Sequence, residues 1–187
     1  MRVIAGEAGG LRLVAPKGDR TRPTADRVKE SLFSALALHL DGASVLDLYA
    51  GSGALAIEAL SRGARTAVLV ARARPATVAI RANLASTRMG ERARVVCRAV
   101  EAVLRNPAPP EGPFDLVFLD PPYDQPIAGI AKALETLGTP EWSASDARSV
   151  LEGAAGTPGP TWPPGWDATW QRTSGGTIVT VLARLAP

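Results

Sequence analysis

Short hydrophobic runs alternate with segments of helical periodicity through most of this chain. The runs are residues 44–50, 66–71, 94–97 and 114–120. After each run, apolar residues recur every three or four positions, over residues 53–63, 74–86, 99–104 and 127–138. Continuously apolar strands separated by helices are typical of a parallel sheet that helices cover on both faces. We therefore expect an α/β fold.

The N-terminal residues follow a different pattern. Residues 2–16 alternate partly around a glycine-rich centre, which predicts a β-hairpin. A helix is expected from Pro23, with a buried stripe at every fourth position: Val28, Leu32, Leu36 and Leu40. We expect this hairpin and helix to form an appendage over residues 1–40, in front of a main domain over residues 41–187.

The C-terminal part adds three strands. A fifth strand is expected near residues 148–151, followed by a proline-rich loop. Residues 168–173 and 177–185 are two further strands that meet at a glycine pair, as in a hairpin. The sequence thus predicts a Rossmann-like sheet of seven strands, mostly parallel, with an antiparallel last strand.

Composition excludes several classes of protein. The chain has 187 residues, of which 46% are hydrophobic, enough for one compact domain. No apolar run reaches the roughly 18 residues of a membrane span, and no signal-peptide pattern is visible, so we expect a cytoplasmic protein without membrane contact. Cys97 and His39 are the only residues of their types, which excludes an internal disulfide and makes a cysteine or histidine metal site improbable.

Charge is uneven along the chain. Residues 1–30 carry a balance of +3 and residues 62–105 a balance of +8, whereas the whole chain has only +3. A basic front favours a polyanionic partner such as RNA. The candidate contacts there are Arg2, Arg12, Lys17, Arg20 and Arg27. Solvated surface arginines are an equally simple explanation.

The first motif is VLDLYAGSGALAIEAL, in which a strand enters a glycine turn that opens a helix. Gly51 and Gly53 allow a tight bend and a close approach of backbone to ligand, and the helix start offers unpaired N–H groups. The looser dinucleotide pattern G-x-G-x-x-A also fits, with Arg72 and Arg74 about 20 residues on. An NADP-dependent oxidoreductase is therefore the alternative, although Asp47 in the strand would be out of place beside a pyrophosphate.

The second motif is FDLVFLDPPYDQ, which puts Asp-Pro-Pro-Tyr at the carboxyl end of the fourth strand. In an open α/β sheet this end faces the ligand crevice. Prolines stiffen the turn and remove N–H groups that would pair with its carbonyls. Asp120 and the Pro121 carbonyl are therefore expected to accept the two hydrogens of a planar exocyclic amine, while Tyr123 stacks on its ring.

Together the motifs DLYAGSG and DPPY resemble those of S-adenosylmethionine-dependent amino-methyltransferases. The opening stretch, RVIAGEAGGLRLVAPKGDRTRPTADRVKESLF, is similar to the signature of the RsmD-type enzymes, which methylate N2 of a guanine in small-subunit (16S) ribosomal RNA. The resemblance covers nearly the whole chain. It implies a class I methyltransferase sheet, S-adenosylmethionine as cofactor without a metal, and ribosomal RNA, the small subunit or its assembly intermediate as partner of a monomer.

The resemblance also implies roles for single residues. The catalytic group would be Asp120, Pro121, Pro122 and Tyr123. The cofactor would be lined by Asp47, Tyr49, Ala50, Gly51, Gly53, Ala71, Arg72, Cys97, Arg98 and Ala99, with Arg22 and Thr24 reaching back toward the cleft. From the sequence alone, Cys97 is expected to be a small buried group.

One departure from the family concerns the end of the second strand. Ala71 and Ala73 stand where the family usually has acidic residues that bind the ribose hydroxyls. Loss of one charge-assisted hydrogen bond weakens binding by about 1.5–3 kcal/mol. A non-catalytic RNA-binding relic with weakened cofactor binding is therefore a second alternative.

Guanine N2 is a poor nucleophile, because its lone pair is delocalised into the ring. Catalysis would then need positioning more than a strong base, with Asp120 as the principal residue. Since a base inside a duplex cannot reach such a turn, we expect an unpaired or flipped-out target.

Overall fold

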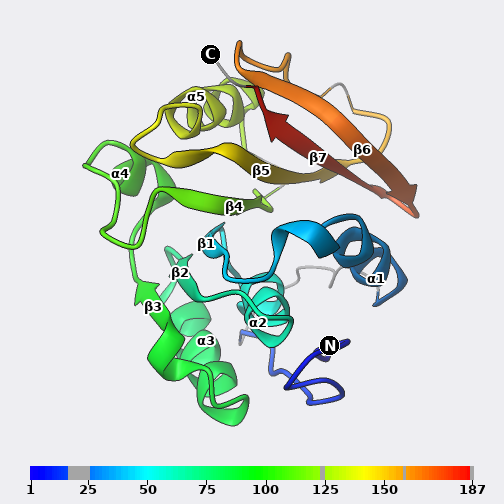
Figure 1. The fold of residues 1–187 in the computed structure, drawn as a ribbon, viewed down its shortest axis with the longest axis vertical. Helices are drawn as coiled ribbons and strands as arrows, with labels where there is room; N and C mark the ends of the chain where they lie inside the picture. Colours follow the sequence, from blue (N-terminus) through cyan, green and yellow to red (C-terminus); the bar gives the residue numbers. More distant parts are fainter. Residues whose placement is uncertain (17–25, 123–124, 158, 186–187) are drawn as a thin grey trace.

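The computed structural model describes residues 1–16, 26–122, 125–157 and 159–185, and within them seven strands form one sheet (Figure 1). The strands are β1 (Ser44–Leu48), β2 (Thr66–Val70), β3 (Ala93–Val96), β4 (Phe114–Leu119), β5 (Ser143–Ala154), β6 (Trp166–Ser174) and β7 (Thr177–Arg184). The α-helices are α1 (Asp26–Ala35), α2 (Ala54–Ser61), α3 (Arg74–Ser86), α4 (Val100–Leu104) and α5 (Ile127–Leu137). Short 3-10 helices span Ala37–His39 and Gly90–Arg92.

The strand order is β3-β2-β1-β4-β5-β7-β6, which Figure 1 shows from β3 at the bottom to β6 at the top. The first five strands run parallel, and β7 pairs antiparallel with both β5 and β6. This confirms the predicted seven-stranded sheet. The expected hairpin at the glycine pair is also present, with Ser174 opposite Thr177.

Register aligns the ends of the central strands. Leu48, the last residue of β1, pairs with Val70 of β2 on one side and with Leu119 of β4 on the other. The chain passes from β1 outward to β2 and β3, then returns to the opposite side of β1 as β4. The carboxyl ends of β1 and β4 therefore form the topological switch point, where ligands bind in open α/β sheets.

Two hydrophobic clusters cover the two faces of the sheet. On one face, Val45 and Phe118 pack with residues of α1, α2 and α3. On the other face, Leu46 and Leu119 pack with residues of α4 and α5 and with Trp142. Because alternate strand residues point to opposite faces, helices on both sides require strands that are apolar throughout, as the sequence has them.

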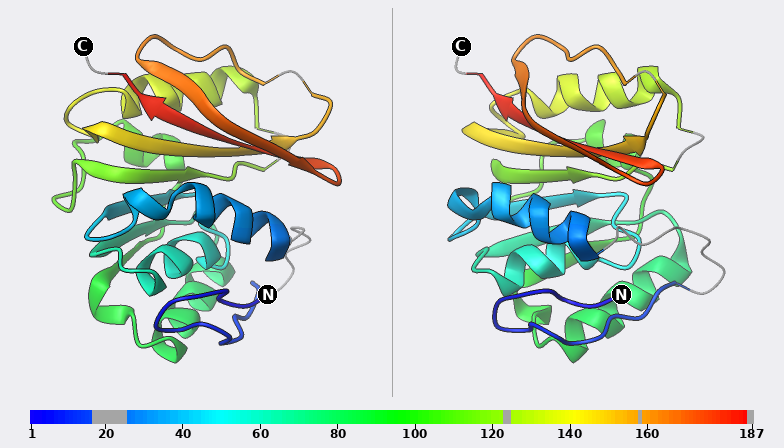
Figure 2. Two further views of the ribbon diagram at one scale, coloured as in Figure 1. Left: turned by 45° about the vertical axis from the view of Figure 1, so that its right-hand side comes forward. Right: turned by 90° about the vertical axis from the view of Figure 1, so that its right-hand side faces the viewer.

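The N-terminal segment turns back on itself as a short hairpin, with an antiparallel bridge from Arg2 to Arg12 and backbone hydrogen bonds from Val3 N–H to the Leu11 carbonyl and from Leu13 N–H to the Met1 carbonyl. Three of its other N–H groups bind side chains of α2. The backbone N–H groups of Ile4 and Ala5 donate to the Glu58 carboxylate, and that of Ala8 donates to Ser61 Oγ. In both views of Figure 2 the segment, drawn in dark blue, lies at the end of the molecule away from β6 and β7.

Helix α1 confirms the predicted stripe. Val28 and Leu32 are buried on it, and Leu36 and Leu40 are buried just after it. The start that the sequence predicts at Pro23 lies outside the described residues. These side chains share one hydrophobic cluster with β1 and α2. The expected division of the chain into an appendage over residues 1–40 and a main domain over residues 41–187 stays a prediction.

None of the described helices combines the length and the hydrophobicity of a membrane span.

Glu58 is the most heavily bonded buried charge in this region. Besides the two backbone N–H groups, at 2.7 and 3.0 Å, its carboxylate contacts Lys29 Nζ at 3.2 Å and Arg62 Nε at 2.7 Å. The Glu58 side chain is fully buried and that of Lys29 nearly so. A buried carboxylate persists only with such compensation, so this network fastens the N-terminal segment and α1 to α2.

We expect Glu58→Ala to lower the free energy of unfolding by about 3–5 kcal/mol, because two backbone N–H groups lose their acceptor and the buried Lys29 ammonium, which still donates to the Arg2 carbonyl, loses its counter-charge. Urea denaturation measures this loss. The matched control is Glu135→Ala on α5, whose exposed ion pair with Lys132 should contribute less than about 1 kcal/mol. A loss for Glu58→Ala no larger than for the control would contradict the role of the network.

Candidate active site

The glycine turn between β1 and α2 uses its two glycines for different reasons. Both have positive φ, 53° for Gly51 and 79° for Gly53. A Cβ on Gly53 would lie 2.9 Å from Leu69 Cδ2, so this glycine lets α2 pack against β2. A Cβ on Gly51 would meet nothing closer than the Tyr49 carbonyl oxygen, at 3.9 Å. Gly51 therefore leaves one side of the turn open for the approach of a ligand.

Tyr49 is the first residue after β1 and has a left-handed backbone, with φ of 67°. This conformation is costly for a residue with a side chain and often marks functional turns. It turns the half-buried ring toward the cluster on the α4 and α5 face. Burial, and then the charge of Glu101, raise the pKa of the Tyr49 hydroxyl to about 12. Tyr49 therefore stays protonated at neutral pH.

Asp47 lies under the glycine turn, on the opposite face. Its side chain is buried, and Oδ2 accepts a hydrogen bond from the backbone N–H of Ala56 at 3.3 Å. Burial raises the pKa of Asp47 to about 7, against the opposite effect of that hydrogen bond. Asp47 thus holds the first turn of α2. Its contact with a cofactor stays a prediction, as do those of Ala50, which is buried, and Gly51.

The second turn leaves β4 directly after Leu119. Asp120 is exposed, Pro121 is buried and Pro122 is exposed. The backbone N–H of Gln125 donates to the Pro122 carbonyl at 2.9 Å, so this carbonyl is already bonded. Tyr123 lies outside the described residues. Because Leu48 and Leu119 are paired, Tyr49 and Asp120 leave neighbouring strands at the same level.

A polar contact that the sequence analysis missed joins this turn to α4. The Gln125 side-chain amide donates from Nε2 to Glu101 Oε1 at 3.2 Å. Both residues follow carboxyl ends of strands, Gln125 after β4 and Glu101 in the first turn of α4 after β3. In the sequence, only their positions after the ends of β4 and β3 could have indicated that Gln125 and Glu101 lie near the site.

The ends of β2 and β3 also meet. The Ala71 N–H donates to the Val96 carbonyl at 3.0 Å, and Cys97 Sγ contacts the Arg72 carbonyl at 3.9 Å. Ala71 is buried, whereas Arg72 is exposed. The expected burial of Cys97 is wrong: its side chain is exposed, because it follows the last residue of an edge strand.

Further candidates flank these strand ends. Arg98 is exposed and Ala99 is the N-cap of α4. Arg2 forms an exposed ion pair with Asp26 at 3.0 Å. Arg12 and Arg27 are exposed. Lys17, Arg20, Arg22 and Thr24 lie outside the described residues. All of these roles stay predictions.

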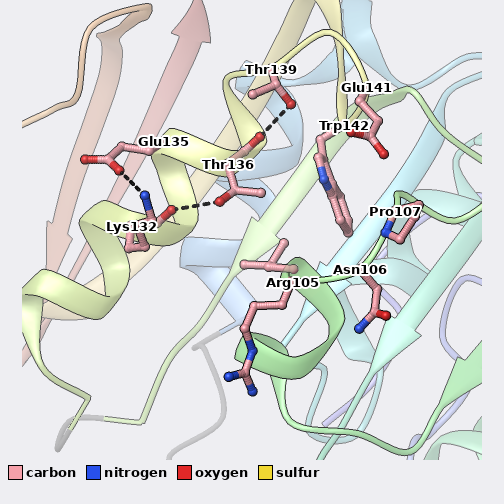
Figure 3. A pocket seen from close by; sticks show the side chains of 10 residues that line it. Arg105, Asn106, Pro107, Lys132, Glu135, Thr136, Thr139, Glu141 and Trp142 are labelled. Carbon is pink, nitrogen blue, oxygen red and sulfur yellow. Dashed lines mark hydrogen bonds and ion pairs between the residues drawn. The ribbon is translucent and has the colours of Figure 1, made fainter.

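Two hollows lie elsewhere on the surface. One, of about 450 Å³, lies between the C-terminal ends of α4 and α5 and is lined by Arg105, Lys132 and Trp142 (Figure 3). In it, Lys132 pairs with Glu135, and the Thr136 hydroxyl donates to the Lys132 carbonyl. Its polar side chains thus already have partners within the chain, including Arg105 and Asn106, which donate to carbonyls of α4. The other, of about 740 Å³, lies between α1 and β6.

No group of three or more His, Cys, Asp and Glu side chains suited to a metal ion occurs among the described residues.

Asp47→Asn should change the pH dependence of stability. The pKa of Asp47 rises from its usual 3.8 to about 7 on folding, so the native state keeps a proton that the unfolded chain has released. This contribution is full below the unfolded pKa and is lost as the pH rises through about 7. Relative to the variant, the wild type should lose up to about 1.4 kcal/mol of unfolding free energy per pH unit over this range.

Urea denaturation from about pH 4 to about pH 8 tests this. The variant keeps a carbonyl that can accept from Ala56. Glu135→Gln, at an exposed position of α5, is the control, and its unfolding free energy should depend on pH as that of the wild type does. Parallel profiles for Asp47→Asn would contradict the raised pKa.

Comparison with known proteins shows the family of this chain. The family model described as "Conserved hypothetical protein 95" matches residues 1–183. "Ribosomal RNA small subunit methyltransferase D" of Escherichia coli K12 is 35% identical over 175 residues, which cover 94% of this chain and 85% of that protein. The protein of the same name from Haemophilus influenzae is 32% identical over 176 residues, which cover 94% of this chain and 89% of that protein.

A solved structure shows the same fold. The Escherichia coli protein yhhF superposes with a TM-score of 0.85 at 34% identity, covering 100% of this chain and 99% of its own. Sequence and fold agree over essentially the whole length. The chain belongs to the RsmD-type family of ribosomal RNA methyltransferases.

Proposed function

We propose that this chain transfers a methyl group from S-adenosylmethionine to N2 of a guanine in small-subunit ribosomal RNA. The observation that supports this proposal most strongly is the pairing of Leu48 with Leu119, which brings the glycine turn and the Asp-Pro-Pro turn to one edge of the sheet. The family supports ribosomal RNA as substrate and methyl transfer as reaction. A ribosomal substrate would place the chain in the cytoplasm.

The cofactor side of this site fits S-adenosylmethionine in part. Gly51 offers an open backbone surface, and α2 begins three residues later with its N–H groups directed at the turn. Asp47 supplies a carboxylate beneath it. The end of β2 offers no acidic side chain, since Ala71 and Ala73 stand there. When bound, the cofactor supplies an electrophilic methyl group on a sulfonium.

The base side positions the amine. Asp120 and the Pro121 carbonyl would accept one hydrogen each from guanine N2. The Pro122 carbonyl accepts from the Gln125 N–H, so the proposal assigns the amine to Asp120 and the Pro121 carbonyl. Acceptors on both N–H bonds favour the rehybridised, more positive nitrogen of the transition state. The Asp120 carboxylate also lies where the released proton can be taken up.

Two other functions remain as alternatives in the test. An NADP-dependent oxidoreductase would use the same glycine turn with Arg72 and Arg74, but family membership favours the methyltransferase. An RNA-binding relic without catalysis is favoured by the alanines at 71 and 73. Calorimetric titration with S-adenosylmethionine, S-adenosylhomocysteine and NADP separates the three. Preferential NADP binding would overturn the proposal, and no binding to any of them would favour the relic.

Asp120→Ala should reduce methyl transfer at least about hundredfold, because it removes an acceptor that acts in the transition state. Transfer of tritium from labelled S-adenosylmethionine to small subunits and to naked rRNA measures the rate. Digestion to nucleosides should identify N2-methylguanosine. Cofactor affinity should stay within twofold of wild type, and Asp146→Ala is the exposed control. Undiminished transfer by Asp120→Ala would refute its role.

Restoring acidic groups at the end of β2 should strengthen cofactor binding. We expect Ala71→Glu combined with Ala73→Asp to tighten the Kd for S-adenosylmethionine about tenfold to hundredfold, through charge-assisted hydrogen bonds to the ribose. Ala71→Gln combined with Ala73→Asn has the same shape without charge and should gain less. Equal affinities in calorimetry for wild type and both variants would show that the ribose does not lie here.

A further inference from the structure

The Asp-Pro-Pro turn is held from outside its own strand. Its last described contact is the 2.9 Å hydrogen bond from the Gln125 N–H to the Pro122 carbonyl. The side chain of the same Gln125 then donates to Glu101 on α4 at 3.2 Å. One residue therefore closes the turn through its backbone and ties it to a second helix through its amide.

Helix α5 leaves room for this arrangement. A Cβ on Gly129 would lie 2.8 Å from Gln125 Nε2, closer than real Cβ contacts. The end of the flexible Gln125 side chain can shift, so Gly129 gives the amide room without being required for it. The amide thus lies beside α5 and donates to Glu101.

The charge of Glu101 also reaches the residue that follows the first strand. Its charge acts on the hydroxyl of Tyr49, which it helps to keep protonated. Tyr49 follows β1, Glu101 follows β3 and Gln125 follows β4. Three strand ends around the proposed site are therefore coupled at one carboxylate.

We propose that Glu101 and Gln125 form a latch that positions the Asp120–Pro122 turn for methyl transfer. This inference rests on the proposed function. Both residues are positioning residues: they act by holding the turn, and the proposal assigns them no contact with the methyl donor or the base. A hydrogen bond between exposed side chains adds little to global stability. Its effect should therefore be seen in the placement of Asp120, where small displacements are costly in rate.

Kinetics of single and double variants test the latch. We expect Glu101→Ala and Gln125→Ala each to lower kcat about tenfold at unchanged KM for S-adenosylmethionine, because the turn is less well placed. The double variant should be no slower than either single one, since both remove the same contact. Glu101→Gln keeps an acceptor oxygen and should retain activity within about threefold.

Glu135→Ala, on the exposed face of α5, is the control and should match wild type. Thermal denaturation should give the same Tm for all of these proteins. Independent, multiplicative losses in the double variant, or wild-type kcat in Glu101→Ala, would overturn the latch.

Hydrogen exchange separates failure of the latch from failure of the proposed function. If the wild type transfers no methyl group, the proposed function fails. The latch is still tested by the exchange rate of the Gln125 backbone N–H, which should rise at least about tenfold in Glu101→Ala as the turn opens more often. Unchanged exchange in that variant would overturn the latch whether or not the protein is active.

Discussion

The register of β1 between β2 and β4 is the constraint on which the site depends. Leu48 pairs with Val70 and with Leu119, so the three strands end together and the next residue of each comes to one edge. A slip of one residue would exchange the two faces of β1. Asp47 would then leave α2 for the face of α4 and α5, and the hydrogen bond to Ala56 would be lost. Continuous apolar runs on both faces make such a slip costly, because the clusters on each side fit one alternation only.

Helix α2 transmits this placement to the N-terminal segment through two buried carboxylates. Asp47 binds the N–H of Ala56 in its first turn. Glu58, two residues further along the helix, binds two N–H groups of the segment and the ammonium of Lys29 on α1. The helix that follows the glycine turn therefore also fixes the segment before it in sequence. This explains how residues outside the sheet keep a defined place relative to the glycine turn.

Local patterns predicted those features whose cause is local. The strands and α3 follow from apolar runs and periodicity. The first turn follows from glycines, which have unusual backbone freedom, and the second from prolines, which restrict the backbone. The predicted N-terminal hairpin forms only a short pairing of Met1 and Val3 with Leu11 and Leu13, because Glu58 and Ser61, more than fifty residues away, take the N–H groups of Ile4 and Ala8. Strand β5 begins five residues before the predicted start, since a polar stretch pairs with β4 across an irregularity in register. Gln125 and Glu101 are individually ordinary, and only the fold brings them together across 24 positions.

A positively charged methyl donor and a polyanionic RNA make opposite demands on one edge of a sheet. Under the proposed function, burial separates the groups that would meet the methyl donor from those that would meet the RNA. Asp47 is buried beneath the glycine turn, whereas Arg72 and Arg98 are exposed at the ends of β2 and β3. Salt screens exposed charges over about 10 Å, so the arginines act mainly on a partner that touches them, while a buried carboxylate is screened much less. Alanine at position 71 places no negative charge beside these arginines. Under the proposed function, the end of β2 thus favours RNA phosphates at the expense of cofactor affinity, and the donor must be held mainly from the glycine turn.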